Sequence, residues 1–112
     1  MMKVEAIIRR EKLLDVKTGL SEAGFAGLTV YEVRGRGRQR GYTLNFRGRP
    51  VNIDLLPKVK VEMIVDDSDV DKVIEVIRTY ASTGEVGDGK IFLYPVIDAI
   101  RIRTGERGVE AT

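Results

Sequence analysis

The sequence predicts an α+β domain made of two strand–helix–strand units. Residues 3–9 and 58–65 alternate between apolar and polar side chains, as strands do, and each is followed by a segment whose apolar residues recur at helical spacing. A further strand-like segment closes each unit. This order, βαββαβ, is the ferredoxin-like arrangement, in which two helices cover one face of an antiparallel sheet. The length of 112 residues fits a single domain over residues 1–112.

The first unit begins with the strand over residues 3–9 and continues with a helix over residues 12–24. Gly24 predicts the C-terminus of that helix, because glycine adopts the left-handed conformation that ends many helices. Residues 29–33 are rich in β-branched side chains and predict the second strand.

The second unit opens with the other alternating strand. Ser68 is expected to cap the next helix, with Asp71 three residues later completing a capping box, and the helix is expected to run to residue 81. A strand over residues 90–96 and a short last strand over residues 99–103 complete the prediction. Because the helices cover only one face of this sheet, we expect subunit association to cover the other.

The connection between the second and third predicted strands is far longer than the usual ~4–6 residues. We expect a flexible regulatory loop over residues 37–55. Six arginines stand between Glu32 and Asp54 with no acidic residue among them, so the net charge of +2 leaves about −4 for the rest of the chain. A long, charged loop in so small a domain is typical of a binding function.

The composition excludes several classes of function. The chain has no cysteine and no histidine, which excludes disulfides, thiolate metal sites and every histidine-dependent triad. It has no apolar run near the ~20 residues that span a bilayer and no secretory signal at its start, so a cytoplasmic location is expected. Without histidine or an evident water-activating carboxylate, a binding protein is expected instead of an enzyme.

Three segments could bind an anion. The first, residues 83–90, has two glycines around Asp88 and ends in Lys90. Glycines let the backbone approach a ligand and aim N–H groups at an anion, and lysine adds a positive charge. A plain Gly-rich turn before a strand explains the same residues, and the spacing is not that of a Walker A motif.

The second segment is residues 35–41, where glycine and arginine alternate. It suits phosphate binding, a solvated loop or an RNA-binding arm, but only Tyr42 and Phe46 are near enough for base stacking, so nucleic acid is the weaker functional alternative. The third is the pair Arg101 and Arg103, on one face of the predicted last strand, which fits either an anionic ligand or a solvent-facing edge.

Taken together, these segments closely resemble the PII family of nitrogen-regulatory signal-transduction proteins over essentially the whole chain. Several separate motifs carry the match in the family's order: residues 4–8, 27–30, 32–39, 46–48, 56–62, 83–96 and 101–105. The resemblance implies a homotrimer whose sheets line a common centre. It also implies a regulator, not an enzyme, that binds ATP or ADP in clefts between neighbouring subunits.

The nucleotide-binding residues implied by the resemblance are Thr29, Gly37, Arg38, Gln39, Ile64, Gly87, Asp88, Gly89, Lys90, Arg101 and Arg103. The two glycine-rich segments would cradle the phosphates, and Thr29 and Ile64 would hold the adenine region. Arg101 and Arg103 would reach the phosphates, either from the same subunit or from the adjacent one.

The resemblance implies 2-oxoglutarate as a second ligand, which binds only beside Mg-ATP. The implied residues are Gln39, Arg40, Gly41, Lys58 and Gly87, with Lys58 on the distal carboxylate and Gln39 also on the Mg²⁺ ion. Mg²⁺ favours hard oxygen ligands, here mostly those of the phosphates and the oxoacid. Ligands at the base of the loop would then select among its conformations and so set the affinity for a partner.

The implied partner is an ammonium transport channel, which Arg47 at the tip of the loop would block and which would recruit the protein to the membrane. Nitrogenase and glutamine synthetase are alternative partners for the same sensor, and an Arg-Gly nucleic-acid-binding module is the less favoured function. The positions that carry a modified tyrosine or serine in family members are Val51 and Arg49 here. Control by small molecules alone is therefore expected.

Overall fold

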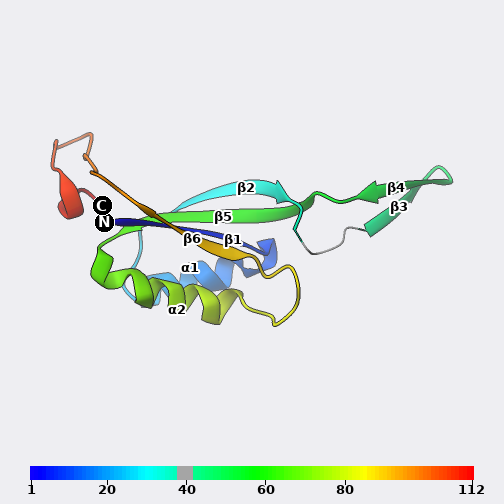
Figure 1. Ribbon diagram of the computed structural model, residues 1–112, viewed down its shortest axis with the longest axis horizontal. Coiled ribbons are helices and arrows are strands. Elements are labelled where there is room, and N and C mark those ends of the chain that lie inside the picture. Colours follow the sequence, from blue (N-terminus) through cyan, green and yellow to red (C-terminus); the bar gives the residue numbers. More distant parts are fainter. Residues whose placement is uncertain (38–41) are drawn as a thin grey trace.

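Two helices lie against one face of a four-stranded antiparallel sheet (Figure 1), which confirms the predicted α+β class and fits the ferredoxin-like arrangement. The computed structural model describes residues 1–37 and 42–112. The strand order in the sheet is β2-β5-β1-β6. The strands are β1 (Met2–Ile8), β2 (Thr29–Gly35), β5 (Leu56–Val65) and β6 (Lys90–Pro95), and the helices are α1 (Leu13–Glu22) and α2 (Val70–Ala81).

The hydrophobic core lies between the sheet and the helices. β1 and β5 are the two central strands, with Val4 opposite Met63 and Ala6 opposite Val61. Since side chains alternate along a strand, this register turns one apolar row toward the helices. The buried core residues are Val4, Ala6, Ile8, Val16, Leu20, Val59, Val61, Met63, Val65, Val70, Val73, Ile77 and Ala81. Burying each of the larger aliphatic side chains contributes about 1.5–3 kcal/mol.

The two helices touch each other at Gly19 of α1 and Tyr80 of α2. A β-carbon at Gly19 would lie 2.4 Å from the Tyr80 ring, so glycine lets α1 come this close. Val73, Ile77 and Ala81 recur every four residues on the buried side of α2. This packing fixes the end of α2 from which the chain returns to the sheet. Within the described ranges, no helix has the length and apolar character needed to cross a membrane.

Each helix is preceded by a short 3₁₀ turn that the sequence did not predict, η1 (Arg10–Lys12) before α1 and η2 (Asp67–Asp69) before α2. The prediction that Ser68 caps the second helix, in a capping box with Asp71, is wrong. The Asp66 carboxylate instead accepts the Ser68 N–H at 3.1 Å. Asp66 has the extended backbone of a cap residue, and its side chain reaches the N–H two residues ahead.

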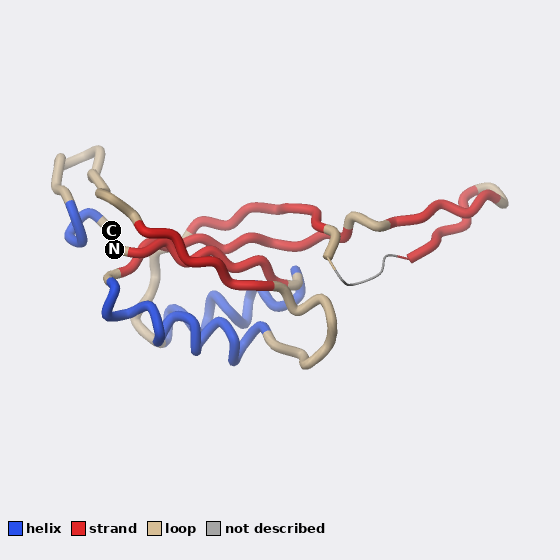
Figure 2. Tube along the Cα trace, viewed as in Figure 1, coloured by secondary structure: helices blue, strands red, loops and turns tan. Residues whose placement is uncertain are grey.

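The long connection between β2 and β5 contains a β-hairpin that the sequence did not predict. β3 (Tyr42–Phe46) pairs with β4 (Arg49–Ile53), and this hairpin, called the arm here, extends away from the rest of the domain (Figures 1 and 2). Arg47 and Gly48 form its tip with φ of 53° and 77°, the positive values that two-residue hairpin turns favour. The predicted loop over residues 37–55 is therefore largely a hairpin, in which residues 42–46 pair with residues 49–53 across a two-residue turn.

The C-terminal segment is not the strand predicted over residues 99–103. Ile100 makes a single bridge with Arg107, and the chain then forms η3 (Gly108–Ala111). The Asp98 carboxylate holds this fold-back, accepting the Gly108 N–H at 3.1 Å and lying 2.6 Å from the Arg107 guanidinium. Because the segment folds back on itself, it adds no strand to the sheet, and that prediction is wrong.

The face of the sheet opposite the helices carries polar side chains that bind one another. Glu5 is 8% exposed, accepts the Tyr94 hydroxyl at 2.8 Å and lies 3.4 Å from Lys60 Nζ. The hydrogen bond from Tyr94, with the help of Lys60 and against the effect of burial, holds the pKa of Glu5 below its usual value. Lys3 lies 4.3 Å from the centre of the Tyr94 ring. These contacts join the side chains of this face, called the open face here, which no helix of the described residues covers.

Candidate functional site

Residues 83–89 form a Gly-rich turn, called the glycine turn here, between α2 and β6. Its centre is the Asp88 carboxylate, which accepts the Thr83 N–H at 2.8 Å, the Gly84 N–H at 2.9 Å and the Thr83 hydroxyl. The hydrogen bond from the Thr83 hydroxyl is the largest of several effects that hold the pKa of Asp88 far below its usual value. Asp88 is therefore ionised at neutral pH and shapes the turn from inside.

Two cations of the sheet hold the glycine turn from the other side. Arg9, just after β1, lies 3.1 Å from the Asp88 carboxylate through Nε and donates from Nη2 to the Val86 carbonyl at 2.8 Å. Lys58 of β5 donates to the Gly87 carbonyl at 2.6 Å. Partial burial, followed by the charge of Arg9, lowers the pKa of Lys58. Because these two carbonyls are engaged by cations of the sheet, the turn is fixed relative to the strands that flank it.

Gly89 fits against β1 where no other residue could. Its φ is 100°, and an added β-carbon would lie 1.7 Å from the Ile7 carbonyl oxygen. Gly84 and Gly87 also have positive φ, of 86° and 106°. The glycines are thus required by the course of the backbone, which brings successive peptide groups close to the neighbouring cavity.

A cavity of about 560 Å³ adjoins the glycine turn. Gly87 and Gly89 of the turn line it together with Lys90 of β6, and Lys58 of β5 and residues 35–37 line it from the side of the arm. No Asp or Glu is among its described lining residues, whereas Arg36, Lys58 and Lys90 are. A cavity that combines these cations with glycines, whose backbone an anion can approach closely, is suited to a multiply charged anion.

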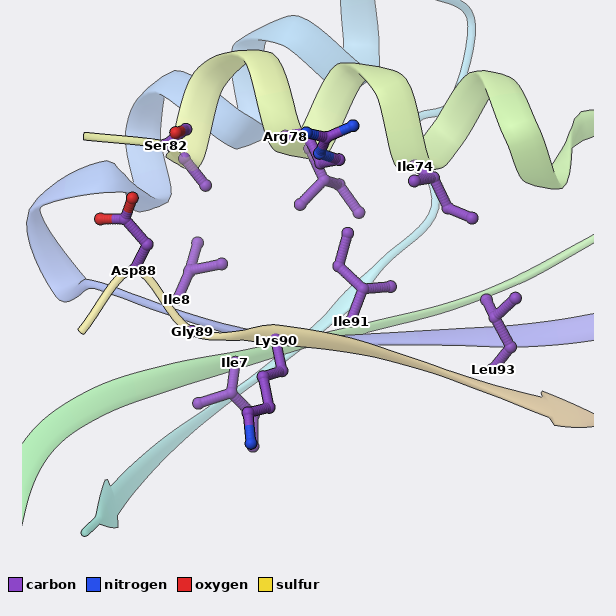
Figure 3. A pocket seen from close by; sticks show the side chains of 12 residues that line it. Ile7, Ile8, Ile74, Arg78, Ser82, Asp88, Gly89, Lys90, Ile91 and Leu93 are labelled. Atoms are coloured by element: carbon purple, nitrogen blue, oxygen red, sulfur yellow. The ribbon is translucent and has the colours of Figure 1, made fainter. Parts of the chain in front are cut away.

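A second cavity, of about 390 Å³, lies between α2 and β6 (Figure 3). Ile91 and Leu93 project from β6 toward the side on which Ile74 of α2 lies, whereas Lys90 projects to the opposite side of the sheet. Asp88 stands at one end of this second cavity and does not line the first. The walls are mainly aliphatic, so the cationic cavity is the better candidate for an anion.

Comparison with known proteins identifies the family. A family profile described as "Nitrogen regulatory protein P-II" matches residues 1–106. The chain belongs to the P-II family. It is 57% identical to Nitrogen regulatory protein P-II 2 of Methanothermobacter thermautotrophicus, over 99% of this chain and 96% of the relative. It is 56% identical to Nitrogen regulatory protein P-II of Nostoc punctiforme and 52% identical to that of Rhodospirillum rubrum, over 99% of each chain. P-II proteins are regulatory signal-transduction proteins that act on partner proteins and are not enzymes.

In this P-II chain, five of the predicted ligand-binding residues meet at one end of the sheet. Gly37, Gly87, Gly89 and Lys90 meet Lys58 at one cavity, although they come from three separate segments. The predicted residues Arg38, Gln39, Arg40 and Gly41 lie outside the described residues. Asp88 is the exception among the predicted residues of the glycine turn, because it does not line this cavity.

The other predicted nucleotide residues of the P-II chain lie toward the opposite end. Thr29 is opposite Glu62 at the start of β2, and Ile64 is opposite Lys3, whereas Lys58 lies six residues before Ile64 on β5, about 20 Å away along the strand. Arg101 is engaged locally, by Glu106 at 3.2 Å and by the Glu110 carbonyl at 2.9 Å, and Arg103 is exposed nearby. One chain therefore does not bring Thr29, Ile64 or the two arginines to the cavity.

The predicted partner-binding residue, Arg47, lies at the tip of the arm. Its guanidinium is 5.5 Å from the centre of the Phe46 ring. The register places Tyr42, Leu44 and Phe46 on one side of the hairpin with Val51 and Ile53, and these residues form an apolar face, with Leu44 50% and Phe46 64% exposed. Thr43 and Asn52 pair on the other side, where Thr43 donates to Asn52 at 3.0 Å.

Arg9 and Asp54 were not among the predicted site residues, and Arg36 was predicted only as part of the Gly-Arg segment over residues 35–41. Arg9 acts on the glycine turn across 79 residues, a contact that only the antiparallel pairing of β1 with β6 brings about. Arg36 lines the cationic cavity and is bonded to Asp54. The alternation of glycine and arginine was the signal for this segment, but it did not single out Arg36 from the other arginines.

Proposed function

We propose that this P-II protein senses ATP or ADP together with 2-oxoglutarate, and passes the result to a partner through the arm. The observation that carries the proposal is the cationic cavity, where Gly37, Gly87, Gly89 and Lys90 converge with Lys58 and with no described acidic residue. Its volume of about 560 Å³ is in the range of small-molecule sites.

The phosphates would lie against the glycine turn. Arg9 and Lys58 engage the carbonyls of Val86 and Gly87, and Gly87 and Gly89 both line the cavity, where glycine backbone can come close to an anion. Lys90 would add a point charge to the same phosphates. Asp88 would act indirectly, as the carboxylate that keeps the turn in this shape.

2-Oxoglutarate would bind beside the phosphates, with its distal carboxylate on Lys58. Gln39, Arg40, Gly41 and Gly87 would complete that pocket. The described lining residues offer cations and N–H groups instead of carboxylates, which fits a Mg²⁺ ion held mostly by oxygens of the ligands, with Gln39 as its protein ligand. The metal would neutralise the phosphates, so that a second anion can bind in the same cavity.

A homotrimer would complete the nucleotide site. Thr29, Ile64, Arg101 and Arg103 lie toward the far end of the chain from the cavity, so a site that includes both groups needs residues of two copies. Contacts that join one end of a subunit to the other end of the next form a ring when the rotation between neighbours closes, as it would in a trimer. The open face of the sheet would lie at the centre of that ring.

The arm would deliver the signal to a membrane channel for ammonium, on its cytoplasmic side. The support is the shape and chemistry of the arm, a narrow hairpin with an exposed apolar face and Arg47 at its tip. A cation on a thin apolar wedge is suited to entering and closing a pore. The positions of modified tyrosine and serine in other members are Val51 and Arg49, so small ligands would control the arm without covalent modification.

Calorimetric titration tests the sensing function. We expect the wild type to bind Mg-ATP, and to release heat with 2-oxoglutarate only when Mg-ATP is present. Lys90→Gln should weaken Mg-ATP binding about tenfold or more, because a hydrogen bond to a charged group contributes about 1.5–3 kcal/mol. Lys17→Gln, on the exposed side of α1, is the matched control and should bind as the wild type does.

Two results would contradict the proposal. A wild-type protein that binds neither ATP nor ADP would refute nucleotide sensing, and a protein that binds 2-oxoglutarate equally well without Mg-ATP would refute the coupling of the two ligands. A sedimentation experiment on the same sample tests the assembly, and a monomer under conditions of tight ATP binding would refute the shared site.

A further inference from the structure

Arg36 and Asp54 form an ion pair across the base of the arm. β2 and β5 are paired as far as Gly35 and Leu56, and the ion pair lies just beyond this last pair of the ladder. Arg36 Nη1 donates to the Asp54 carboxylate at 3.0 Å, and the two side chains are 68% and 58% exposed. The ion pair therefore links the strand that leads into the arm with the strand that leads out of it.

Arg36 is also a lining residue of the cationic cavity, together with Lys58 and Lys90. Its guanidinium thus has a carboxylate partner at the base of the arm and an anion site next to it. An exposed ion pair of this kind stabilises a structure by about 0–1 kcal/mol. A guanidinium that holds phosphate or carboxylate oxygens through two parallel N–H bonds gains more, so an anion in the cavity can displace Asp54.

We propose that Arg36 is an anion-binding residue of the cavity, and that it exchanges Asp54 for a phosphate or carboxylate of the bound ligand. This inference rests on the proposed function, since it takes the cavity to be the phosphate site. Ligand binding then breaks the Arg36–Asp54 link and loosens the base of the arm. By reciprocity, a partner that holds the arm with the link closed weakens ligand binding by the same factor.

The exchange predicts opposite effects for the two members of the ion pair. Arg36→Gln removes an anion ligand and should weaken about tenfold the binding of the ligand that Arg36 holds, which is Mg-ATP for a phosphate and 2-oxoglutarate for a carboxylate. Asp54→Asn removes the competitor and should strengthen the same binding by up to about fivefold, the factor that corresponds to 1 kcal/mol. Both variants are exposed surface changes and are expected to fold. If the ion pair only held the arm in shape, both substitutions would shift the affinity in the same direction.

The double variant separates exchange from a general effect of charge. Removing a carboxylate near a cationic site strengthens anion binding even without direct competition. If Asp54 acts through Arg36, Asp54→Asn has no effect in the Arg36→Gln background, whereas a general effect persists there. Equal strengthening by Asp54→Asn in both backgrounds would overturn the proposal.

The source of the anion is tested by three probes: Mg-ATP, inorganic tripolyphosphate, and 2-oxoglutarate added after Mg-ATP. If Arg36 binds a phosphate oxygen, Arg36→Gln weakens the binding of Mg-ATP and of tripolyphosphate. If Arg36 binds a carboxylate, the substitution weakens only the binding of 2-oxoglutarate. Both results support the exchange and assign its ligand. Wild-type affinities in Arg36→Gln for all three probes would overturn it, while the sensing function would still stand, because the wild type binds ATP.

The arm provides an independent readout. Because the chain has no cysteine, Asn45→Cys offers a unique attachment point for a fluorophore on the polar side of the hairpin. We expect Mg-ATP to lower the fluorescence anisotropy of the wild-type arm as the link opens. Asp54→Asn should show the lower value before ligand is added, and an unchanged anisotropy in that variant would contradict the link.

Discussion

The closest backbone contact in the site gives the sharpest prediction, for the substitution Gly89→Ala. The new β-carbon would lie 1.7 Å from the Ile7 carbonyl oxygen, and the residue would have to keep a φ of 100°. Strain of this kind costs about 1–3 kcal/mol. Overpacking against atoms that cannot rotate away costs a further 1–3 kcal/mol, so the two together reach about 2–6 kcal/mol.

This cost must lower either the free energy of unfolding or the affinity for the ligand. If the turn keeps its shape, the free energy of unfolding falls by that amount; if the turn moves away from β1, the cavity changes and Mg-ATP affinity falls instead. The assays are urea unfolding at fixed protein concentration and calorimetry with Mg-ATP. A loss of 2 kcal/mol in binding corresponds to about 30-fold.

Substitutions at two other glycines distinguish the effect of backbone strain from that of the steric clash. Gly24 has a φ of 95° but open space around its β-position, and Gly27 has neither constraint. We expect the loss of stability or affinity to be largest for Gly89→Ala, smaller and confined to stability for Gly24→Ala, and negligible for Gly27→Ala. If Gly89→Ala matched Gly27→Ala in both assays, the reasoning about the close contact with Ile7 would be refuted.

Three further predictions concern other parts of the molecule. Gly19→Ala should lower the free energy of unfolding by about 1–3 kcal/mol, because the new methyl group clashes with the Tyr80 ring. In a chain that also carries Tyr80→Ala, Gly19→Ala should be nearly neutral. If the effects of the two substitutions were additive, the clash would not be the cause. The pKa of Asp88 is depressed, so its contribution to the free energy of unfolding is complete above the ordinary pKa of 3.8 and is lost as the pH falls below that value. In Asp88→Asn, the free energy of unfolding should therefore decline less steeply with acid than in the wild type. An identical decline in the two proteins would show that Asp88 does not anchor the turn. Arg47→Ala should keep Mg-ATP affinity but lose block of an ammonium channel in a transport assay, with Thr43→Ala on the polar side of the arm as the control; undiminished block would remove Arg47 from this role.

Periodicity predicted the elements that bury one face. β1, β5 and α2 have apolar residues at regular spacing because each turns one side to the core, so their existence followed from the sequence. The arm also alternates, with Tyr42, Leu44 and Phe46 on one side, but its strands are short and almost wholly exposed, and they lie in a stretch that glycines and arginines marked as a loop. The alternation around Arg101 and Arg103 resembles that of a strand, but the hydrogen bond from the Gly108 N–H to Asp98 folds the segment back.

The candidate site was predictable where the backbone required glycine. Gly87 and Gly89 stood out in the sequence because a turn and a close approach restrict those positions to glycine. The contacts of Arg9 and Arg36 could not be predicted in the same way. Many arginines in this chain have similar neighbours in sequence, and only the pairing of distant strands selects the ones that reach the glycine turn and the cavity.

At the tip of the arm, thermal stability and the proposed binding function favour different residues. Among the described residues, Arg47 is the only one other than glycine with a positive φ, in a position where Asn or Gly is favoured in two-residue turns. A left-handed residue with a β-carbon costs about 1–2 kcal/mol. Selection for heat resistance alone would therefore replace this arginine, and a library sorted only by melting temperature should enrich Gly or Asn there while discarding the positive charge that the tip presents.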